Sequence, residues 1–457
     1  MTMDGRESEA ASSRAAGGSL SLSGATVWFA ISYGIAVLGY LAVNAFAARL
    51  LYDEFGYFVI AVTAATVLGQ LGLFGAHRGG LREAARLRSD DSEGLLNLRR
   101  AVRVVSVVTL PVTASLSVVG AFLLAADVDG RSRWVLAIGT GVLVWLGGQQ
   151  KLWANYLRGF GHTRLASLFE GRSGGALVAV CQGALVAIVL FFFSDLGLSG
   201  ALAAMAVGFA IPVLLAWYLV SRMWRHVHPG KLTLKDVRHV IHRNRHFASN
   251  MLGGSLNSNL ETWIAGVVFT SINVSLFSAA QRLSTLLSIS IMSMGVVFSP
   301  VVSRLFARDD DQLEALLRTG ATLAAVFTGI LWIPMLVAPQ LLLQAVYGDA
   351  FGGAALILVI LTLGSVSNVL TGMCAVPLTM SQHEAVVAKL QWGGVVLRIG
   401  LGTLLATQFG TVGLAVSAAM VSTCVSGTLW YVTRRRMGIW THPTLRPDLR
   451  LLRRTAG

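Results

Sequence analysis

A stretch of the chain at residues 250–282 carries polar side chains of the kind that do chemistry inside a membrane. Asn257, Asn259 and Glu261 lie in a run that is otherwise apolar enough to sit in lipid. Glu261 is the only carboxylate that the sequence places well inside an apolar span. Because an ionisable group at membrane depth is costly, it should face a bundle interior or a water-filled cavity, near a partner. The nearest cation in the sequence is Arg282, across a predicted turn, so this hairpin is our candidate for the wall of a transport pathway.

The composition is that of a membrane protein with many spans. The chain has 457 residues, of which 54% are hydrophobic and 13% charged, whereas a soluble protein carries about 25% charged residues. No soluble catalytic domain fits between the apolar runs, so we expect a transporter that is not an enzyme and uses no cofactor. Cys181, Cys374 and Cys424 lie in apolar runs without paired spacing, which predicts buried thiols rather than a disulfide or a metal site.

About twelve apolar runs are long enough to cross a membrane, at ~20 residues for each crossing. They lie at residues 25–49, 56–76, 102–125, 134–156, 174–193, 198–220, 248–270, 277–303, 319–342, 353–378, 386–407 and 411–432. We therefore predict an all-α fold with two pseudo-symmetric six-helix bundles, residues 24–220 and 247–433. A disordered cytoplasmic tail (1–23), a basic linker (221–246) and a basic cytoplasmic tail (434–457) complete the chain.

The basic residues indicate how the chain crosses the membrane. Most of the Lys and Arg residues fall on one set of loops, at residues 78–100, 151–172, 221–245 and 304–318. The opposite loops hold only Arg49, Arg131 and Arg133. This asymmetry predicts both termini in the cytoplasm and a location in the cytoplasmic membrane. It also accounts for the net charge of +14 without nucleic acid as a partner. The histidines of the linker have no convincing metal-ligand spacing, which favours a basic segment at the lipid headgroups.

Short motifs recur six predicted spans apart. Residues 86–99 follow the second span, and the similar charged segment at 304–318 follows the eighth. Gly197-Leu-Ser-Gly200 opens the sixth span, and Gly410-Thr-Val-Gly413 opens the twelfth. Matching elements in the same orientation predict parallel repeats about an axis along the membrane normal, with the substrate site at the interface of the halves.

The order and spacing of several motifs resemble those of polysaccharide flippases. Residues 47–58 look like the first outer loop of that family, although Tyr52 replaces the usual glycine. Residues 273–283 resemble the start of its eighth span, with Ser275 in place of a glycine and Phe277 in place of a tyrosine. Further similar motifs are Tyr156–Gly161, Tyr347–Phe351 and Phe409–Ala415. The resemblance covers residues 25–436 and places the chain in the multidrug/oligosaccharidyl-lipid/polysaccharide exporter superfamily.

The resemblance implies a V-shaped, MATE-like fold. It also implies translocation of a polyprenyl-diphosphate-linked oligosaccharide from the inner to the outer leaflet for cell-surface polysaccharide biosynthesis. Such a carrier needs amides for the sugars and cations for the diphosphate, and the planar guanidinium of arginine suits phosphate. The candidate cations are Arg49, Arg282 and Arg398. The candidate amides are Asn44, Asn257 and Gln391. Glu261 could pair with an arginine or take up a coupling H⁺ or Na⁺.

Each candidate also has a plainer interpretation. Arg49 and Arg282 lie near the predicted outer surface, where their side chains could extend to the lipid headgroups. Glu261 and Arg282 could form a static pair, and the amides could simply join helices by hydrogen bonds. Arg398 lies deeper, which favours a paired or functional role.

Two other functions stay open. A cation-coupled multidrug antiporter of the same fold would need a cavity rich in carboxylates and aromatics, whereas the spans hold more Arg than Glu. A membrane-embedded glycosyltransferase or polysaccharide polymerase would need a large external loop or an acid cluster, and the predicted outer loops are short. A polymerase or glycosyltransferase could instead be a partner protein. The chain has no G-x-x-x-x-G-K-[ST] motif, which disfavours direct ATP hydrolysis.

Overall fold

The computed structural model describes residues 28, 31–84, 91–125, 129–170, 175–227, 230, 232–292, 294–295, 298, 302, 312–381 and 383–448. Every regular element in these residues is helical, in agreement with the all-α prediction. The predicted tail at residues 1–23 and most of the repeated charged segment at 304–318 lie outside the described residues.

The N-terminal half begins with a helix at residues 31–51. The elements that follow are η1 (Tyr52–Glu54), α2 (Phe55–Leu73), α3 (Ala76–Ala84), α4 (Ser92–Val104), the π-helical η2 (Val105–Thr109), α5 (Leu110–Leu124), α6 (Gly130–Gly159), α7 (Thr163–Phe169), α8 (Ala176–Phe192), η3 (Ser194–Leu196) and α9 (Gly197–Met223). Capping residues define where some of these helices begin. For example, the Asp91 carboxylate caps α4 by accepting a hydrogen bond of 2.8 Å from the Gly94 N–H.

The helices of the C-terminal half begin with α10 (Leu234–Val268), whose start has a clear sequence signal. A capping box formed by Thr233 and Asp236 begins this helix. The later elements are α11 (Ser271–Leu286), a helical stretch described in part within 289–302, α13 (Gln312–Val337), α14 (Pro339–Tyr347), η4 (Asp349–Ala354), α15 (Ala355–Thr371), α16 (Ala375–Met380) and α17 (Glu384–Met437). The predicted linker is therefore largely helical, since only residues 224–233 separate α9 from α10.

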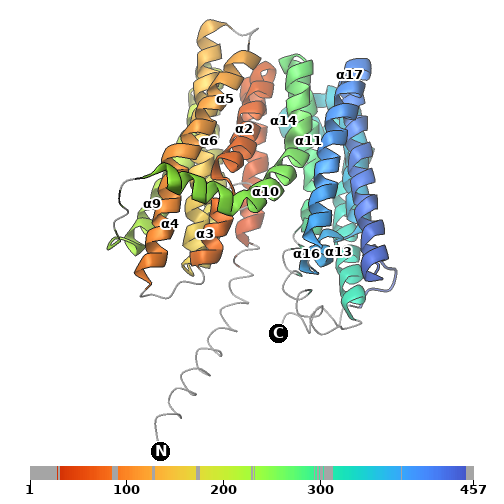
Figure 1. Ribbon diagram of the computed structural model, residues 1–457. Coiled ribbons are helices and arrows are strands. Elements are labelled where there is room, and N and C mark those ends of the chain that lie inside the picture. Colours follow the sequence, from red (N-terminus) through yellow and green to blue (C-terminus); the bar gives the residue numbers. More distant parts are fainter. Residues whose placement is uncertain are drawn as a thin grey trace, which may run out of the picture.

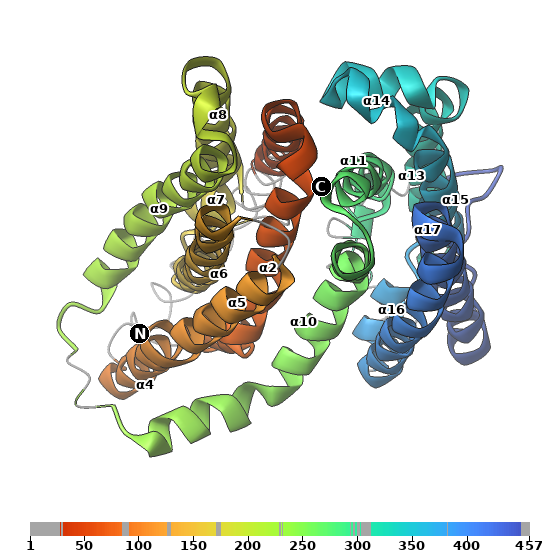
Figure 2. The same ribbon diagram turned by 90° about the horizontal axis from the view of Figure 1, so that it is seen from above.

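The helices form two groups that stand side by side. Figure 1 shows α2–α9 on one side and α11–α17 on the other, with α10 crossing from the first group to the second. Viewed from above, α10 runs along the N-terminal group before it reaches the C-terminal group (Figure 2). Two hydrogen bonds attach α10 to α2: Trp263 Nε1 donates to Thr63 Oγ1 at 3.2 Å, and Ser255 Oγ donates to Gln70. This is the predicted MATE-like arrangement of two helical bundles.

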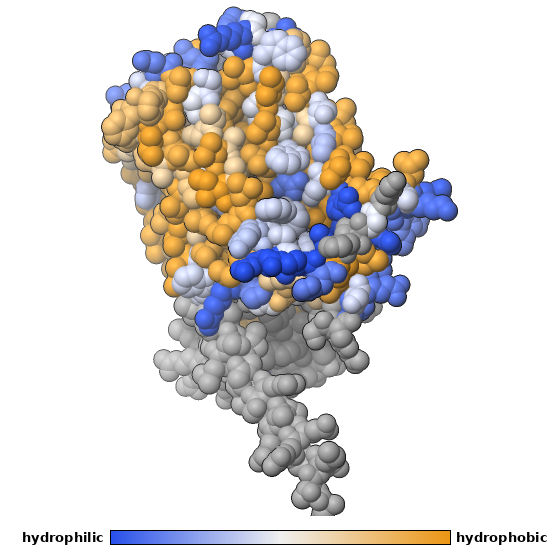
Figure 3. Space-filling view, turned by 90° about the vertical axis from the view of Figure 1, so that its left-hand side faces the viewer, coloured by the Kyte–Doolittle hydropathy of each residue, from blue (hydrophilic) through white to orange (hydrophobic). Residues whose placement is uncertain are grey.

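The surface and the helix lengths suit a membrane. Six segments of the described residues are long and apolar enough to cross it. Two of them, Ile31–Leu73 and Ala385–Met437, each cover most or all of two predicted spans. The total of about twelve spans stays a prediction. Apolar residues cover the middle of the face in Figure 3, and hydrophilic residues gather toward its ends. Phe191 and Phe192 are 72% and 76% exposed, which suits contact with lipid tails.

Two turns differ from the prediction. Residues 271–275 were expected to form an outer loop, but they are already helical, and only Phe269 and Thr270 separate α10 from α11. The expected loop at 408–410 is a break inside α17, where Gly410 takes φ 64° and ψ −148°. Gly197 at the start of α9 has nearly the same conformation, with φ 49° and ψ −133°. Only glycine adopts this region readily, so the matched breaks support the prediction of repeated halves.

The buried core is shared at one end of the molecule and divided at the other. At the end that carries η1, here called the η1 end, Phe55 and Phe58 belong to the same core as Phe277 and Tyr347 of the other half. At the opposite end, here called the linker end, each half has a core of its own. The two halves are therefore joined at the η1 end, which lies at the top of Figure 1.

A candidate binding site at the seam between the halves

Arg282 lies on α11 at the seam between the halves. Its Nε and Nη2 atoms are buried and have no hydrogen-bond partner among the described residues. Its guanidinium carbon lies 5.1 Å from the centre of the Tyr40 ring, which belongs to the other half. A cation over an aromatic ring gains about 0.5–2 kcal/mol, which does not replace the hydrogen bonds that a buried guanidinium loses. The site therefore holds a positive charge that is suited to an anionic ligand.

Polar groups near Arg282 are also left without partners. Tyr347 of α14 lies near Arg282 of α11. Its hydroxyl and that of Ser278 are buried and make no hydrogen bond within the part of the chain that the structure describes. Buried polar groups are nearly always paired, and one arginine with two hydroxyls can donate several hydrogen bonds to phosphate oxygens. The arrangement is a group of buried polar atoms without hydrogen-bond partners among the described residues.

The seam is closed on the η1 side of Arg282. The ring centre of Phe55 lies 6.3 Å from that of Tyr347 and 5.9 Å from that of Phe351, which joins the two halves by aromatic contacts. Arg49 Nη2 donates a hydrogen bond of 2.6 Å to the carbonyl oxygen of Ala345. Arg49 was predicted to bind substrate or to extend toward lipid, but in this structure it ties the halves together.

Two departures from the flippase motifs also take part in this closure. Ser275, in place of a glycine, accepts a hydrogen bond of 2.7 Å from the Gly56 N–H across the seam. Tyr52, in place of another glycine, has φ 31°, a conformation that favours glycine. The Tyr52 ring packs edge-on against Phe351 at 6.0 Å between centres. These side chains add contacts between the halves that glycine could not make.

Arg398 lies inside the C-terminal half, and each of its three guanidinium nitrogens has a partner there. It forms an ion pair with Glu261, and its Nε donates to Asn257 Oδ1 at 2.7 Å. Its Nη2 donates to Ser422 Oγ at 2.9 Å. Asn257 and Glu261 are four residues apart on α10, so both face the same side of that helix. The static pair of Glu261 with Arg282, one of the interpretations left open above, is not formed, because Glu261 is paired with Arg398.

The predicted amides fall in different surroundings. Asn44 is buried and donates to the Tyr40 carbonyl oxygen at 2.7 Å, within its own helix. Gln391 on α17 has a buried Oε1 atom without a hydrogen-bond partner in the described structure. Of the three predicted amides, Asn257 is the one that hydrogen-bonds to a predicted arginine, Arg398, among the described residues. Within the part of the chain that the structure describes, no three His, Cys, Asp or Glu side chains form a cluster that could hold a metal ion.

Sequence reasoning missed Tyr40, Tyr347 and Ser422. Tyr347 stands in one of the motifs that resemble polysaccharide flippases, so a focus on the motif residues would have found it. Tyr40 is one helical turn before Asn44, but nothing in the sequence places it beside Arg282. Ser422 reaches Arg398 only because α17 reverses at Gly410. Such a partner depends on tertiary packing.

Comparisons with known proteins identify the family. The protein family described as "Polysaccharide biosynthesis protein" matches residues 21–306. The chain belongs to this family, which confirms the resemblance to polysaccharide flippases. A relative named "Probable low-salt glycan biosynthesis flippase Agl15", from Haloferax volcanii, is 22% identical over 191 residues, or 42% of this chain. The match spans 40% of the length of that relative.

Two solved structures have the same fold. One is described as "Inward-facing conformation of a multidrug resistance MATE family transporter of the MOP superfamily"; it has a TM-score of 0.66 at 17% identity and covers 88% of this chain and 94% of its own. The other is "Lipid II flippase MurJ, inward closed conformation", with a TM-score of 0.68 at 12% identity and 89% and 87% coverage. At these identities the likeness concerns the fold. The chain is thus a multi-pass membrane protein with the fold of this transporter superfamily.

Proposed function

We propose that this protein moves a polyprenyl-diphosphate-linked oligosaccharide from the inner to the outer leaflet of the cytoplasmic membrane, as a transporter rather than an enzyme. The observation that carries the proposal is Arg282, a cation at the seam between the halves whose buried Nε and Nη2 atoms have no hydrogen-bond partner among the described residues. An anionic headgroup that contains phosphate would supply the missing hydrogen-bond acceptors. Membership of the polysaccharide biosynthesis family and the flippase relative support a lipid-linked glycan as the substrate.

The contacts across the seam suggest how one cycle begins. With the η1 end outside, as the basic loops predict, the shared core and the Arg49 contact close the outer side. The headgroup would then reach Arg282 from the inner leaflet. Binding would replace the missing partners of Arg282, and opening of the η1 end would require the seam contacts to separate. The substrate can drive such a change only if it binds the two states differently.

A multidrug antiporter is the second candidate, and the structure offers less for it. A cationic drug needs an available carboxylate, but Glu261 is already neutralised by Arg398. Glu261 is buried, with 3% of its surface exposed. Coupling to H⁺ or Na⁺ would require this ion pair to open, because the carboxylate cannot serve both partners at once. We therefore assign Glu261 to a switch or a structural pair and not to drug binding.

The experiment that separates the two functions uses the full chain in vesicles. Vesicles with the protein receive a labelled polyprenyl-diphosphate sugar in one leaflet, and its appearance in the other leaflet is followed over time. Parallel vesicles contain a fluorescent cationic drug. We expect movement of the lipid above that of protein-free vesicles, and no drug efflux when a proton or sodium gradient is imposed. Drug efflux without movement of the lipid would favour the antiporter and contradict the proposal.

A further inference from the structure

A cavity of about 500 Å³ lies within the C-terminal half, toward the linker end. Its walls come from the helical stretch within 289–302, from the break between α15 and α16, and from α17. Apolar side chains dominate the lining, including Ile291, Met292, Met373 and Leu429. Methionine side chains are flexible and adapt to ligands of irregular shape. The volume falls in the range of small-molecule sites, about 300–1,000 Å³.

The cavity has one polar edge, and this edge points toward Arg398. Asn368 and Ser426 line the cavity, and Ser426 Oγ donates to Asn368 Oδ1 at 3.1 Å. Ser426 is one helical turn beyond Ser422, which binds Arg398 Nη2 at 2.9 Å. Residues four apart lie on the same face of a helix. Arg398 and the apolar cavity are therefore consecutive along one face of α17, with the cavity nearer the linker end.

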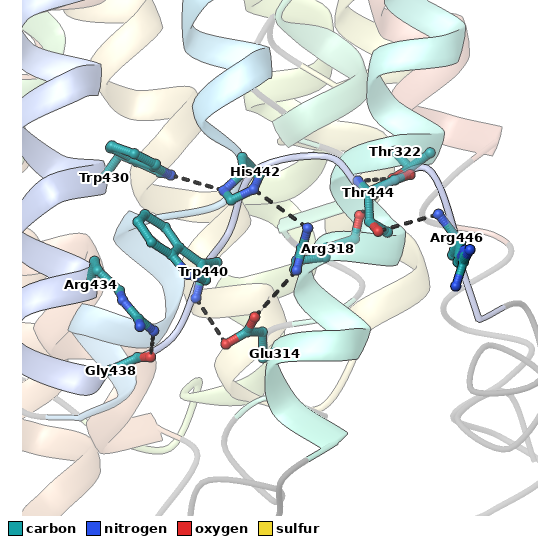
Figure 4. Close-up of polar contacts among 10 residues, drawn as sticks. All are labelled: Glu314, Arg318, Thr322, Trp430, Arg434, Gly438, Trp440, His442, Thr444 and Arg446. Atoms are coloured by element: carbon teal, nitrogen blue, oxygen red, sulfur yellow. Dashed lines mark hydrogen bonds and ion pairs between the residues drawn. The ribbon is translucent and has the colours of Figure 1, made fainter.

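Residues 438–448, here called the C-terminal strap, pack against the part of the cavity wall formed by Thr371 and Gly372. Thr441 is buried against Gly372, and its Oγ1 donates to the carbonyl oxygen of Thr371 at 2.7 Å. Figure 4 shows the rest of the strap along α13, where the Thr444 N–H donates to Thr322 Oγ1 at 2.9 Å. The Trp440 N–H donates to Glu314 at 3.1 Å. The strap fixes the α15–α16 break, so the cavity has a defined wall on this side.

We propose that this cavity binds the first isoprene units of the lipid carrier, with the headgroup lying beyond the polar edge at Asn368 and Ser426. The inference rests on the proposed function and adds to it a site for the hydrocarbon chain. An apolar cavity with one polar edge matches a hydrocarbon chain joined to a polar headgroup. The arrangement also suits the predicted orientation, because the chain stays at inner-leaflet depth while the headgroup moves toward Arg282 at the seam.

A substitution that fills the cavity tests the proposal. A Cβ atom at Gly295 would lie 3.6 Å from Val376 Cγ2, so a larger side chain at this position extends into the cavity. Gly329 on α13 has no atom within 4 Å of its Cβ position, which makes Gly329→Leu the matched control. Vesicles with each variant receive the same sugar diphosphate on a full-length polyprenyl chain or on a chain of two isoprene units.

We expect Gly295→Leu to slow movement of the long-chain substrate about tenfold and to leave the short-chain substrate within about twofold, because the short chain needs little of the filled volume. Gly329→Leu should move both substrates like the parent protein. An unchanged long-chain rate, or an equal loss for both chains in Gly295→Leu, would overturn the proposal.

A binding measurement keeps this test separate from the transport assay. A photoreactive isoprenyl diphosphate should label the peptides that contain Met292 and Met373, and unlabelled long-chain isoprenyl diphosphate should compete. Competition by ordinary phospholipid to the same extent would mean that the cavity holds a membrane acyl chain, and this outcome contradicts the proposal. If labelling succeeds while the parent protein moves no lipid, the proposed transport fails and the cavity assignment stands.

Discussion

Arg398 is buried, and Arg282 is partly buried with its Nε and Nη2 atoms enclosed. These two arginines of the C-terminal half differ in how their charge is satisfied. Arg398 has a carboxylate, an amide and a hydroxyl around it, all from α10 and α17. Arg282 has an aromatic ring from the other half and two nitrogens without hydrogen-bond partners among the described residues. The first arginine is complete within its own bundle. The second is the one for which we propose a ligand, because the described residues leave two of its nitrogens without hydrogen-bond partners.

From this difference we expect that Arg398 stabilises the fold and that Arg282 binds a ligand. Removal of one partner from a buried ion pair leaves an uncompensated charge, which lowers the free energy of unfolding. Removal of a cation that lacks hydrogen-bond partners changes the free energy of unfolding little. Its effect should be on the binding of the ligand. The two arginines can therefore be distinguished by measuring stability and transport on the same variants.

The largest expected effect is on the Arg398 pair. Glu261→Gln should lower the free energy of unfolding by about 3–5 kcal/mol, because Arg398 then stays buried without a counter-charge. Thermal unfolding in detergent measures the loss. The double variant Glu261→Gln/Arg398→Met removes both charges and should recover most of the stability. If Glu261→Gln is as stable as the parent protein, the pair does not brace the C-terminal half.

The next effect is on transport at the seam. Arg282→Met should lower the rate of lipid movement by roughly 10- to 100-fold, the range that one or two charge-assisted hydrogen bonds supply. Its thermal stability should match or exceed that of the parent protein, because the removed guanidinium has two nitrogens without hydrogen-bond partners among the described residues. Arg131→Met changes an exposed arginine near the η1 end and is the matched control. A large loss of stability in Arg282→Met would mean that this arginine braces the fold as Arg398 does.

A smaller effect is expected at the closed η1 end. Arg49→Ala removes the hydrogen bond to the Ala345 carbonyl oxygen, and because Arg49 is exposed the change should be about 1 kcal/mol, or roughly fivefold in the balance of open and closed seams. A cysteine introduced at Ser278 in a cysteine-free background reports opening through its rate of labelling by a polar maleimide. The rate should rise in Arg49→Ala. An unchanged rate would show that the aromatic contacts alone keep the seam closed.

The smallest effect concerns the C-terminal strap. Partial burial, together with the positive charge of Arg318, lowers the pKa of His442 below its usual value, and Glu314 opposes the shift. A histidine with a lowered pKa stabilises the folded strap when it is neutral, so this contribution is complete above pH ~6.5 and is lost as the pH falls below that value. Proteolysis of the strap should therefore speed up at lower pH. In His442→Gln this pH dependence should be weaker; an identical profile would exclude His442 as its cause.

The sequence was sufficient for the architecture. Long apolar runs and alternate basic loops predicted an all-α membrane protein, and the matched glycine motifs at Gly197 and Gly410 indicated the repeat. The depth of Glu261 and Arg398 was also evident, because charged residues in apolar runs need a partner or a cavity. These features depend on local composition, which one chain displays directly.

The pairing of charges could not be predicted in the same way. Arg282 is nearer to Glu261 in the sequence, but Arg398 is its partner because α10 and α17 pack together in the C-terminal half. Tyr40 reaches Arg282 only when the two halves meet. Arg49 similarly depends on α14, which is far along the chain. Contacts between distant elements decided which arginine braces the C-terminal half and which one closes the seam. They also decided which arginine has two nitrogens without hydrogen-bond partners among the described residues.

One binding measurement tests the role of Arg282 most directly. The parent protein and Arg282→Met are each offered a polyprenyl-diphosphate sugar and an analogue that carries the same sugar and chain without phosphate. We predict that the parent protein prefers the diphosphate and that Arg282→Met loses this preference, with its binding of the uncharged analogue unchanged. An equal preference for the diphosphate in both proteins would show that the charge at the seam does not hold the headgroup.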